Sequence, residues 1–215
     1  MVDVAAVDHV LSTTRSVRRR LDFGRPVPAA VLEECIAVAT QAPTGLFRES
    51  WRFVVVRDPA RKADIAALYR SAFDELVETR LAAAREAGYD VPEPKPTYRM
   101  LAERLQEFPA LVLVCSEGRP EPADPSMQLA FYGSVLPAAW SLMLALRARG
   151  IGSTWTTLLA QRERAVATAL GIPDDVTLTV MLPIGYLKDA VLRPASRRAP
   201  HEVTYWDTWG ERGES

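Results

Sequence analysis

Apolar residues recur three and four positions apart in several long stretches of the chain, and short apolar runs rich in β-branched residues separate these stretches. The first spacing places one apolar face on a helix, and the short runs fit buried strands. The pattern predicts helices at residues 3–14, 28–39, 60–87, 98–106, 126–149 and 162–170. It predicts strands at residues 51–56, 111–115, 153–157 and 176–184, and a short final strand at 203–206.

The order of these elements indicates the fold class. Helices separate most of the strands, so we do not expect strands that follow each other in sequence to pair as hairpins. The expected fold is α+β or α/β, with a small mixed sheet covered by helices. Residues 86–96 and 116–125 contain several prolines and charges and are expected to be flexible loops, and the chain from residue 187 resembles an extended tail. A length of 215 residues fits a single domain over residues 1–215.

The segment 126–146 contains no charged residue. Its length would let a helix cross a bilayer, at about 1.5 Å per residue. Several polar side chains, many alanines and Pro137, which would kink or break a helix, argue against a membrane span. We therefore expect a helix that is buried in the core or in a dimer interface, and no membrane partner.

Composition and charge exclude several classes of function. The 26 basic and 27 acidic residues nearly balance, whereas a nucleic-acid-binding protein usually carries a basic excess, so no nucleic-acid partner is expected. Cys35 and Cys115 stand alone in apolar runs and the chain has only 2 histidines, so no metal site and no disulfide framework are expected. Buried thiols and an N-terminus that does not resemble a signal peptide favour a cytoplasmic location.

A compact basic cluster follows the first predicted helix. It consists of Arg15, Arg18, Arg19 and Arg20, with Ser16 among them. Guanidinium groups, a hydroxyl and the free amides of a turning chain can together grip a phosphate monoester. A solvated basic face is the alternative interpretation of the same residues.

Three further pieces carry candidate chemistry. The Pro-Thr-Gly turn at residues 43–45 lies between a helix and a strand, and is either a ligand-facing turn or an ordinary helix stop. Residues 149–159 (RGIGSTWTTLL) contain a lone Gly-x-Gly that lacks the third glycine of a dinucleotide-binding loop. Residues 193–206 (RPASRRAPHEVTYW) hold a second basic group, Arg197 and Arg198, for which an exposed tail is the alternative.

In their order and spacing, these four pieces resemble the FMN-dependent nitroreductase family, and the likeness covers roughly residues 7–206. The resemblance implies an α+β fold with a mixed, mainly antiparallel sheet flanked by helices. It also implies an intertwined homodimer with FMN at the subunit interface. The implied activity is hydride transfer from NADPH or NADH through the flavin to a small-molecule acceptor, such as a nitroaromatic or a quinone, by a ping-pong mechanism.

The resemblance also implies roles for the basic residues. Arg15 and Ser16 would meet the phosphate and the ribityl chain of FMN, and Arg197 or Arg198 would complete the phosphate clamp. Arg18 would lie near the pyrimidine edge of the flavin, where a cation favours the anionic reduced form.

Other residues are implied to lie against the flavin ring. A backbone amide at Thr157 or Leu158 would face the hydride-accepting nitrogen. No catalytic side chain is implied, because the flavin carries the chemistry. The neighbouring protomer would supply a flavin-facing turn and a substrate-pocket residue, which are Pro43, Thr44 and Gly45 for the turn and Phe47 for the pocket.

The chain departs from the family pattern at several positions. Thr14 replaces a basic residue, and Thr157-Leu158 replaces a Glu-Gly pair. Phe47 and Glu49 replace an asparagine and a glutamine. Because of these changes, the activity of a specialised relative is an alternative interpretation. The candidates are a flavin-fragmenting enzyme, a dehalogenase or an oxidase of a peptide-derived ring. The alternative outside the enzymes is a flavin-binding or storage protein without reductase turnover.

Overall fold

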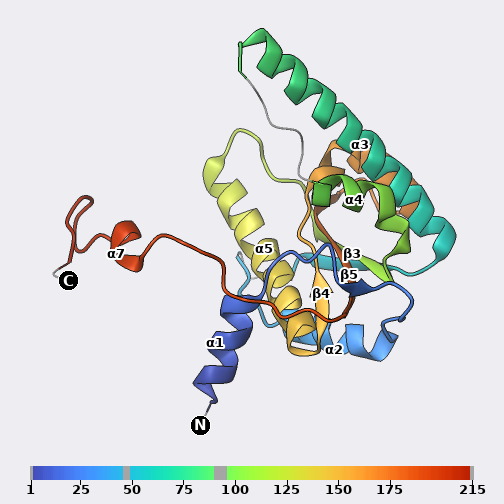
Figure 1. The fold of residues 1–215 in the computed structure, drawn as a ribbon. Helices are drawn as coiled ribbons and strands as arrows, with labels where there is room; N and C mark the ends of the chain where they lie inside the picture. The colour runs from blue at the N-terminus through green and yellow to red at the C-terminus, as the bar shows by residue number, and fades with distance from the viewer. Residues whose placement is uncertain (1, 46–48, 90–95, 214–215) are drawn as a thin grey trace. The chain divides into compact units, whose positions relative to one another are not determined.

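The structure is a computed structural model that describes residues 2–45, 49–89 and 96–213. The chain divides into two compact units, Arg15–Ala190 and Met1–Thr14 with Val191–Ser215. The larger unit contains the sheet and most of the helices (Figure 1). Its strands are β1 (Leu21–Asp22), β2 (Trp51–Val56), β3 (Ala110–Glu117), β4 (Ile151–Ser153) and β5 (Val176–Leu187). Its α-helices are α2 (Ala29–Ala39), α3 (Pro59–Glu86), α4 (Pro96–Arg104), α5 (Pro125–Ala148) and α6 (Glu163–Leu170), and its 3-10 helices are η1 (Leu105–Glu107) and η2 (Leu158–Arg162).

The sheet has the strand order β1-β5-β3-β2, and β4 also pairs with β5. All of these strand pairs are antiparallel, with Leu113 of β3 opposite Val54 on one side and Met181 on the other. Two isolated parallel bridges join Ser16 to Ser153 and Gly118 to Val176. The prediction of a mixed, mainly antiparallel sheet flanked by helices is therefore confirmed.

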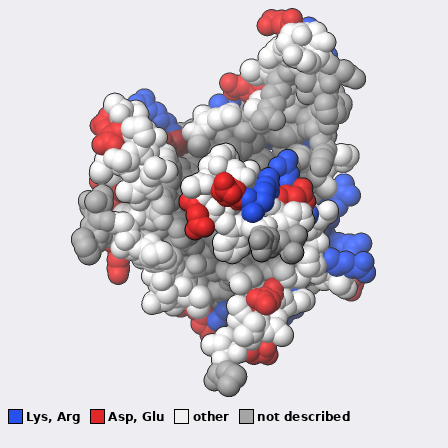
Figure 2. All heavy atoms as spheres, turned by 90° about the vertical axis from the view of Figure 1, so that its left-hand side faces the viewer, with Lys and Arg blue, Asp and Glu red and all other residues white. Residues whose placement is uncertain are grey.

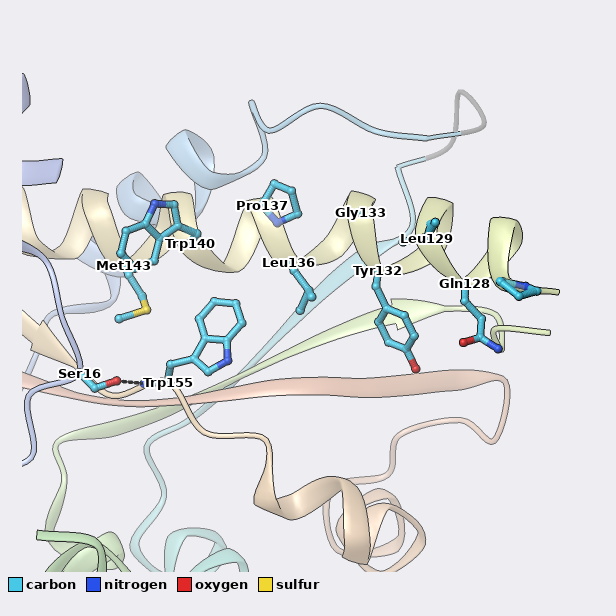
Figure 3. A pocket seen from close by; sticks show the side chains of 11 residues that line it. Ser16, Gln128, Leu129, Tyr132, Gly133, Leu136, Pro137, Trp140, Met143 and Trp155 are labelled. Atoms are coloured by element: carbon cyan, nitrogen blue, oxygen red, sulfur yellow. Dashed lines mark hydrogen bonds between the residues drawn. The ribbon is translucent and has the colours of Figure 1, made fainter. Parts of the chain in front are cut away.

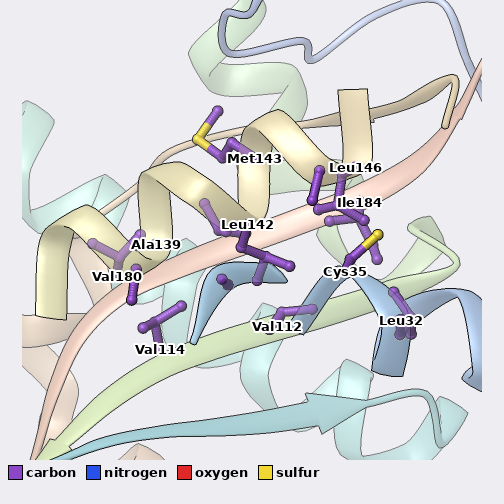
Figure 4. Close-up of a cluster of buried hydrophobic side chains, with 14 of the residues drawn as sticks. Leu32, Cys35, Val112, Val114, Ala139, Leu142, Met143, Leu146, Val180 and Ile184 are labelled. Atoms are coloured by element: carbon purple, nitrogen blue, oxygen red, sulfur yellow. The ribbon is translucent and has the colours of Figure 1, made fainter. Parts of the chain in front are cut away.

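Helices α2 and α5 cover one face of this sheet and form the main core with it (Figure 4). Alternate residues of a strand point to opposite faces, so Val112 and Val114 of β3 enter this core together. Leu111 and Leu113 are also fully buried, which shows that the second face of the sheet is covered as well. A strand buried on both faces explains why the run from Leu111 is apolar without alternation.

Helix α5 confirms the helix predicted at 126–149. Asp124 caps it by accepting hydrogen bonds from the amides of Ser126 and Met127, and Pro137 lies inside it. Among the described residues, α5 is the one helix that is long and apolar enough to cross a membrane. Length and composition alone do not distinguish such a helix from a buried core helix. Ala138 and Leu142 are fully buried, so α5 is a core helix, although Leu129 on its outer side is 77% exposed.

The smaller unit contains α1 (Val4–Thr13) and α7 (Pro200–Val203). The predicted strand at 203–206 is wrong, because the short helix α7 ends at Val203 and residues 204–206 belong to no strand. Pro200 occupies the first turn of α7, and the Glu202 carboxylate accepts from the Ala199 amide at 2.9 Å. A proline at that position and a returning glutamate both favour a helical turn.

The strand predicted at 153–157 is also wrong, since β4 ends at Ser153. Beyond it the Thr154 amide donates to the Pro183 carbonyl at 3.1 Å, and its hydroxyl donates to the Val17 carbonyl at 2.7 Å. Thr156 also pairs with β5, through an isolated antiparallel bridge to Met181. Pairing with β5 is thus irregular after Ser153 and does not continue as a strand.

The remaining predicted helices and strands are confirmed, with small shifts at their ends. Pro28 is the N-cap of α2 and not its first helical residue. Cys35 and Cys115 are fully buried, as predicted. Acidic and basic side chains are interspersed on the face drawn in Figure 2, in keeping with a net charge of −1.

Candidate functional site

The structure brings the first basic cluster beside the segment that follows β4 (Figure 3). The Val17 amide donates to the Ser153 carbonyl at 2.8 Å, and the Trp155 amide donates to Ser16 Oγ at 2.9 Å. The Thr154 hydroxyl adds a third hydrogen bond between the two segments by donating to the Val17 carbonyl. Two segments that the sequence analysis identified separately therefore form one region.

Gly152 lets these segments approach closely. A Cβ atom at this position would lie 2.8 Å from Cδ2 of both Leu187 and Leu21, and 3.3 Å from Val17 Cβ. The Gly-x-Gly sequence thus serves close packing of β4 against its neighbours, in line with the absence of a dinucleotide-binding fingerprint.

The four arginines of the cluster divide into two pairs. Arg19 and Arg20 are exposed, and Arg20 reaches the Asp189 carbonyl at 3.4 Å. Arg15 and Arg18 are half-buried, and within the described residues their buried Nε atoms have no hydrogen-bond partner. A buried guanidinium nitrogen without an acceptor is costly, so this inward pair is suited to an anionic ligand.

An aromatic side chain fixes the second arginine of this pair. Cζ of Arg18 lies 4.5 Å from the centre of the Tyr98 ring, on α4. Stacking on an aromatic face holds a guanidinium in place without consuming its hydrogen-bond donors. Arg18 can therefore offer both charge and donors to a ligand.

The backbone at the start of η2 carries a free donor. The amide and carbonyl of Thr156 both bond to Met181, at 3.2 and 2.9 Å. The Leu158 amide lies 3.5 Å from Thr156 Oγ1. Thr157 is exposed, and among the described residues its amide has no recorded partner. Of the two amides singled out from sequence, that of Thr157 is the better placed to meet a ligand.

An apolar groove of about 970 Å³ runs along α5 beside this region (Figure 3). Ser16 and Trp155 line one side of it, and Tyr132, Leu136 and Trp140 of α5 line the other. Flat aromatic walls and a few polar groups suit a planar, largely apolar ligand.

The Pro-Thr-Gly turn contacts a different part of α5. The Gly45 amide donates to Ser134 Oγ at 2.7 Å, and a Cβ at Gly45 would lie 3.2 Å from the Ala130 carbonyl oxygen. Gly45 lines a pocket of about 210 Å³, and it is not among the described residues that line the groove beside Ser16. Phe47 lies outside the described residues.

The second basic pair belongs to the smaller unit. Arg197 and Arg198 are exposed, and Arg197 lies 3.4 Å from the Ser196 carbonyl. Their part in a phosphate clamp remains a prediction. Among the described residues, no group of three or more His, Cys, Asp or Glu side chains could hold a metal ion.

Sequence reasoning missed the two tyrosines that complete the region. Tyr98 stacks on Arg18, and the hydroxyl of Tyr69 lies 3.1 Å from Thr156 Oγ1. Each lies in a stretch with ordinary helical spacing, where a tyrosine is indistinguishable from a core residue. Only the fold shows that both face the same region.

Comparison with known proteins gives a consistent result. The model of the nitroreductase family matches residues 11–186. Iodotyrosine deiodinase 1 of Mus musculus is 30% identical over 196 residues, covering 90% of this chain and 67% of that protein. The Homo sapiens protein is 28% identical, covering 89% and 64%. The chain thus spans about two thirds of the length of these relatives.

Solved structures share the fold. Oxidised iodotyrosine deiodinase bound to FMN and 3-iodo-L-tyrosine has a TM-score of 0.67 at 25% identity, covering 92% of this chain and 98% of that one. The FMN-dependent nitroreductase NfnB of Mycobacterium smegmatis, in complex with NADPH, has a TM-score of 0.69 at 20% identity, covering 95% and 99%.

Proposed function

The chain belongs to the nitroreductase family, and on that premise we propose that it is an FMN-dependent oxidoreductase using NADPH or NADH. The proposed acceptor is a small electrophile such as a nitroaromatic or a quinone. The observation that carries the proposal is the inward pair of arginines, whose buried Nε atoms have no partner among the described residues. They lie in the segment tied by hydrogen bonds to the chain leading to Thr157.

The residues present fit FMN as a cofactor. Its phosphate is a dianion that the Arg15 guanidinium and the Ser16 hydroxyl can recognise together with Arg197 or Arg198. Its isoalloxazine ring is planar and largely apolar, as the groove beside Trp155 requires. When bound, FMN supplies the hydride chemistry.

The protein's own groups orient and polarise the ring. When FMN is bound, Arg18, held by Tyr98, would supply a fixed positive charge near the ring, and such a charge favours the anionic reduced form. The Thr157 amide, in place of that of Leu158, would be the donor to the reacting ring nitrogen. Neither role requires a side chain that changes protonation state.

We propose that the active form is an intertwined homodimer of single nitroreductase-like domains in the cytoplasm. The turn at Pro43, Thr44 and Gly45 would then meet the flavin of the partner subunit, and Phe47 would line its substrate pocket. Two features support this arrangement: Gly45 is not among the described residues that line the groove of its own chain, and α5 exposes Leu129. Arg197 or Arg198 would complete the phosphate clamp.

Reductive dehalogenation is the second candidate function. It is favoured by 30% identity to a mammalian iodotyrosine deiodinase across 90% of this chain. Under this alternative the acceptor is a halogenated tyrosine, bound on the same flavin. A flavin-storage role without turnover is the alternative outside the enzymes.

One set of measurements separates these functions. Purified protein is expected to be yellow, to lose that colour anaerobically with NADPH or NADH, and to regain it with a quinone or nitroaromatic. Iodide release from 3-iodo-L-tyrosine, without turnover of quinones, would favour the dehalogenase. A yellow protein that no donor reduces would favour storage, and a colourless protein that ignores added FMN would refute all three functions.

A further inference from the structure

Tyr69 places a buried hydroxyl beside the segment that carries the free amide. The residue lies in the middle of α3, and only 4% of it is exposed. Its hydroxyl oxygen is 3.1 Å from Thr156 Oγ1, and either oxygen can donate the hydrogen bond. Buried tyrosine hydroxyls usually find a polar partner, and here the partner belongs to the proposed redox site.

Thr156 is fixed by hydrogen bonds and immediately precedes Thr157, whose amide is free within the described residues. Both of its backbone groups are bonded to Met181 of β5, and its side chain points to α3. The Leu158 amide lies 3.5 Å from the same Oγ1 atom. The hydroxyl of Thr156 therefore connects Tyr69 on one side with the peptide units around Thr157 on the other.

The phenol remains a neutral hydrogen-bonding group at physiological pH. Burial raises the pKa of Tyr69, while its bond to Thr156 and the nearby positive charge of Arg18 act in the opposite direction. The Tyr69 hydroxyl thus reaches the segment with the free amide through its hydrogen bond to Thr156.

We propose that Tyr69 is a positioning residue of the redox site, holding Thr156 so that the Thr157 amide meets the reacting nitrogen of the flavin. This inference rests on the proposed function. A phenylalanine would fill the same space in the core, so packing alone does not require the hydroxyl. The hydroxyl is needed to fix one side-chain orientation of Thr156, and with it the direction of the following peptides.

The test is a double-mutant cycle in the holoprotein with Tyr69→Phe, Thr156→Val and the pair. Each single change is expected to slow anaerobic flavin reduction about tenfold, because one hydrogen bond that aligns the site is lost. The double variant is expected to be no slower than Thr156→Val alone, since that change already removes the Tyr69–Thr156 bond. Tyr89→Phe, at a 73% exposed position just beyond α3, is the matched control and should leave the rate unchanged.

A second readout does not depend on turnover. Hydrogen exchange followed by mass spectrometry should show faster exchange over residues 154–160 in Tyr69→Phe and Thr156→Val, but not in Tyr89→Phe. The affinity for FMN should change less than twofold, about 0.4 kcal/mol.

Three results would overturn the inference. One is a lower thermal midpoint in Tyr69→Phe with wild-type reduction rate and exchange, which would mean that the hydroxyl serves stability alone. Another is a double variant that multiplies the two single effects. The third is a wild-type protein that binds no FMN, which would refute the proposed function together with the role of Tyr69, whereas the first two leave that function intact.

Discussion

The Trp155 amide donates a hydrogen bond to Ser16 Oγ at 2.9 Å, although 139 residues separate the two in sequence. This bond joins the N-terminal segment of the larger unit to the segment that follows β4. Because both segments are proposed to meet the same cofactor, the bond sets their mutual distance before any ligand binds.

Replacing Ser16 with Ala removes that bond and leaves the Trp155 amide without a partner. The free energy of unfolding is expected to fall by about 1 kcal/mol, and FMN should bind more weakly. Urea unfolding and an FMN titration measure the two effects. Ser12→Ala is the control, because that hydroxyl is exposed on α1; equal losses in both variants would speak against a special role for Ser16.

Arg18→Ala removes the fixed cation proposed to lie near the flavin. The reduction potential should fall by about 30 mV or more, which is about 1.4 kcal/mol for two electrons. Arg18→Lys should retain most of the potential, and Arg19→Ala, at an exposed neighbour, should leave it unchanged. A redox titration of the bound flavin measures the reduction potential of each variant. An unaltered potential in Arg18→Ala would refute the charge effect.

Gly152→Ala places a methyl group where three neighbours already lie within 3.3 Å. We expect a loss of stability of about 1–2 kcal/mol from overpacking between β4 and Val17. Gly24→Ala is the matched control, since its nearest contact would be an ordinary 3.6 Å to Asp22 Oδ1. Thermal unfolding of both variants measures this loss of stability. Equal thermal midpoints would show that the side chains around Gly152 shift to accommodate a methyl group at little cost.

Burial raises the pKa of the Cys115 thiol from 9.0 to about 12. The folded chain therefore holds this proton more tightly than the unfolded chain, and the resulting stability is full below pH 9 and is lost as the pH rises toward 12. Cys115→Ala should show a smaller fall in unfolding free energy over that window than the wild type. Parallel pH profiles for the two proteins would exclude this contribution.

Much of the fold follows from local sequence signals. The strand β3 is an unbroken apolar run, and α5 is a long uncharged stretch with an aspartate cap, so both could be predicted. β1 has two residues and carries no such signal. The early end of β4 reflects irregular pairing of Thr154 and Thr156 with β5, which lies far away in sequence.

The candidate site was predictable only in part. Sequence identified the basic cluster, yet it could not separate Arg15 and Arg18, which turn inward, from Arg19 and Arg20, which remain exposed. That division depends on the path of the chain after α1 and on the stacking of Tyr98, a contact across 80 residues of sequence. The choice between Thr157 and Leu158 likewise depends on a side chain, Thr156, whose partners are distant.

Recognition of a phosphate by Arg15 is best examined by comparing FMN with riboflavin, which has the same ring and ribityl chain but no phosphate. In titrations of flavin-free protein, FMN should bind far more tightly than riboflavin. Arg15→Gln should weaken FMN binding about 10- to 100-fold, the loss of one charged hydrogen bond, and leave riboflavin binding unchanged. Equal affinities for the two flavins, or an Arg15→Gln variant that binds FMN as the wild type does, would show that Arg15 does not hold the phosphate.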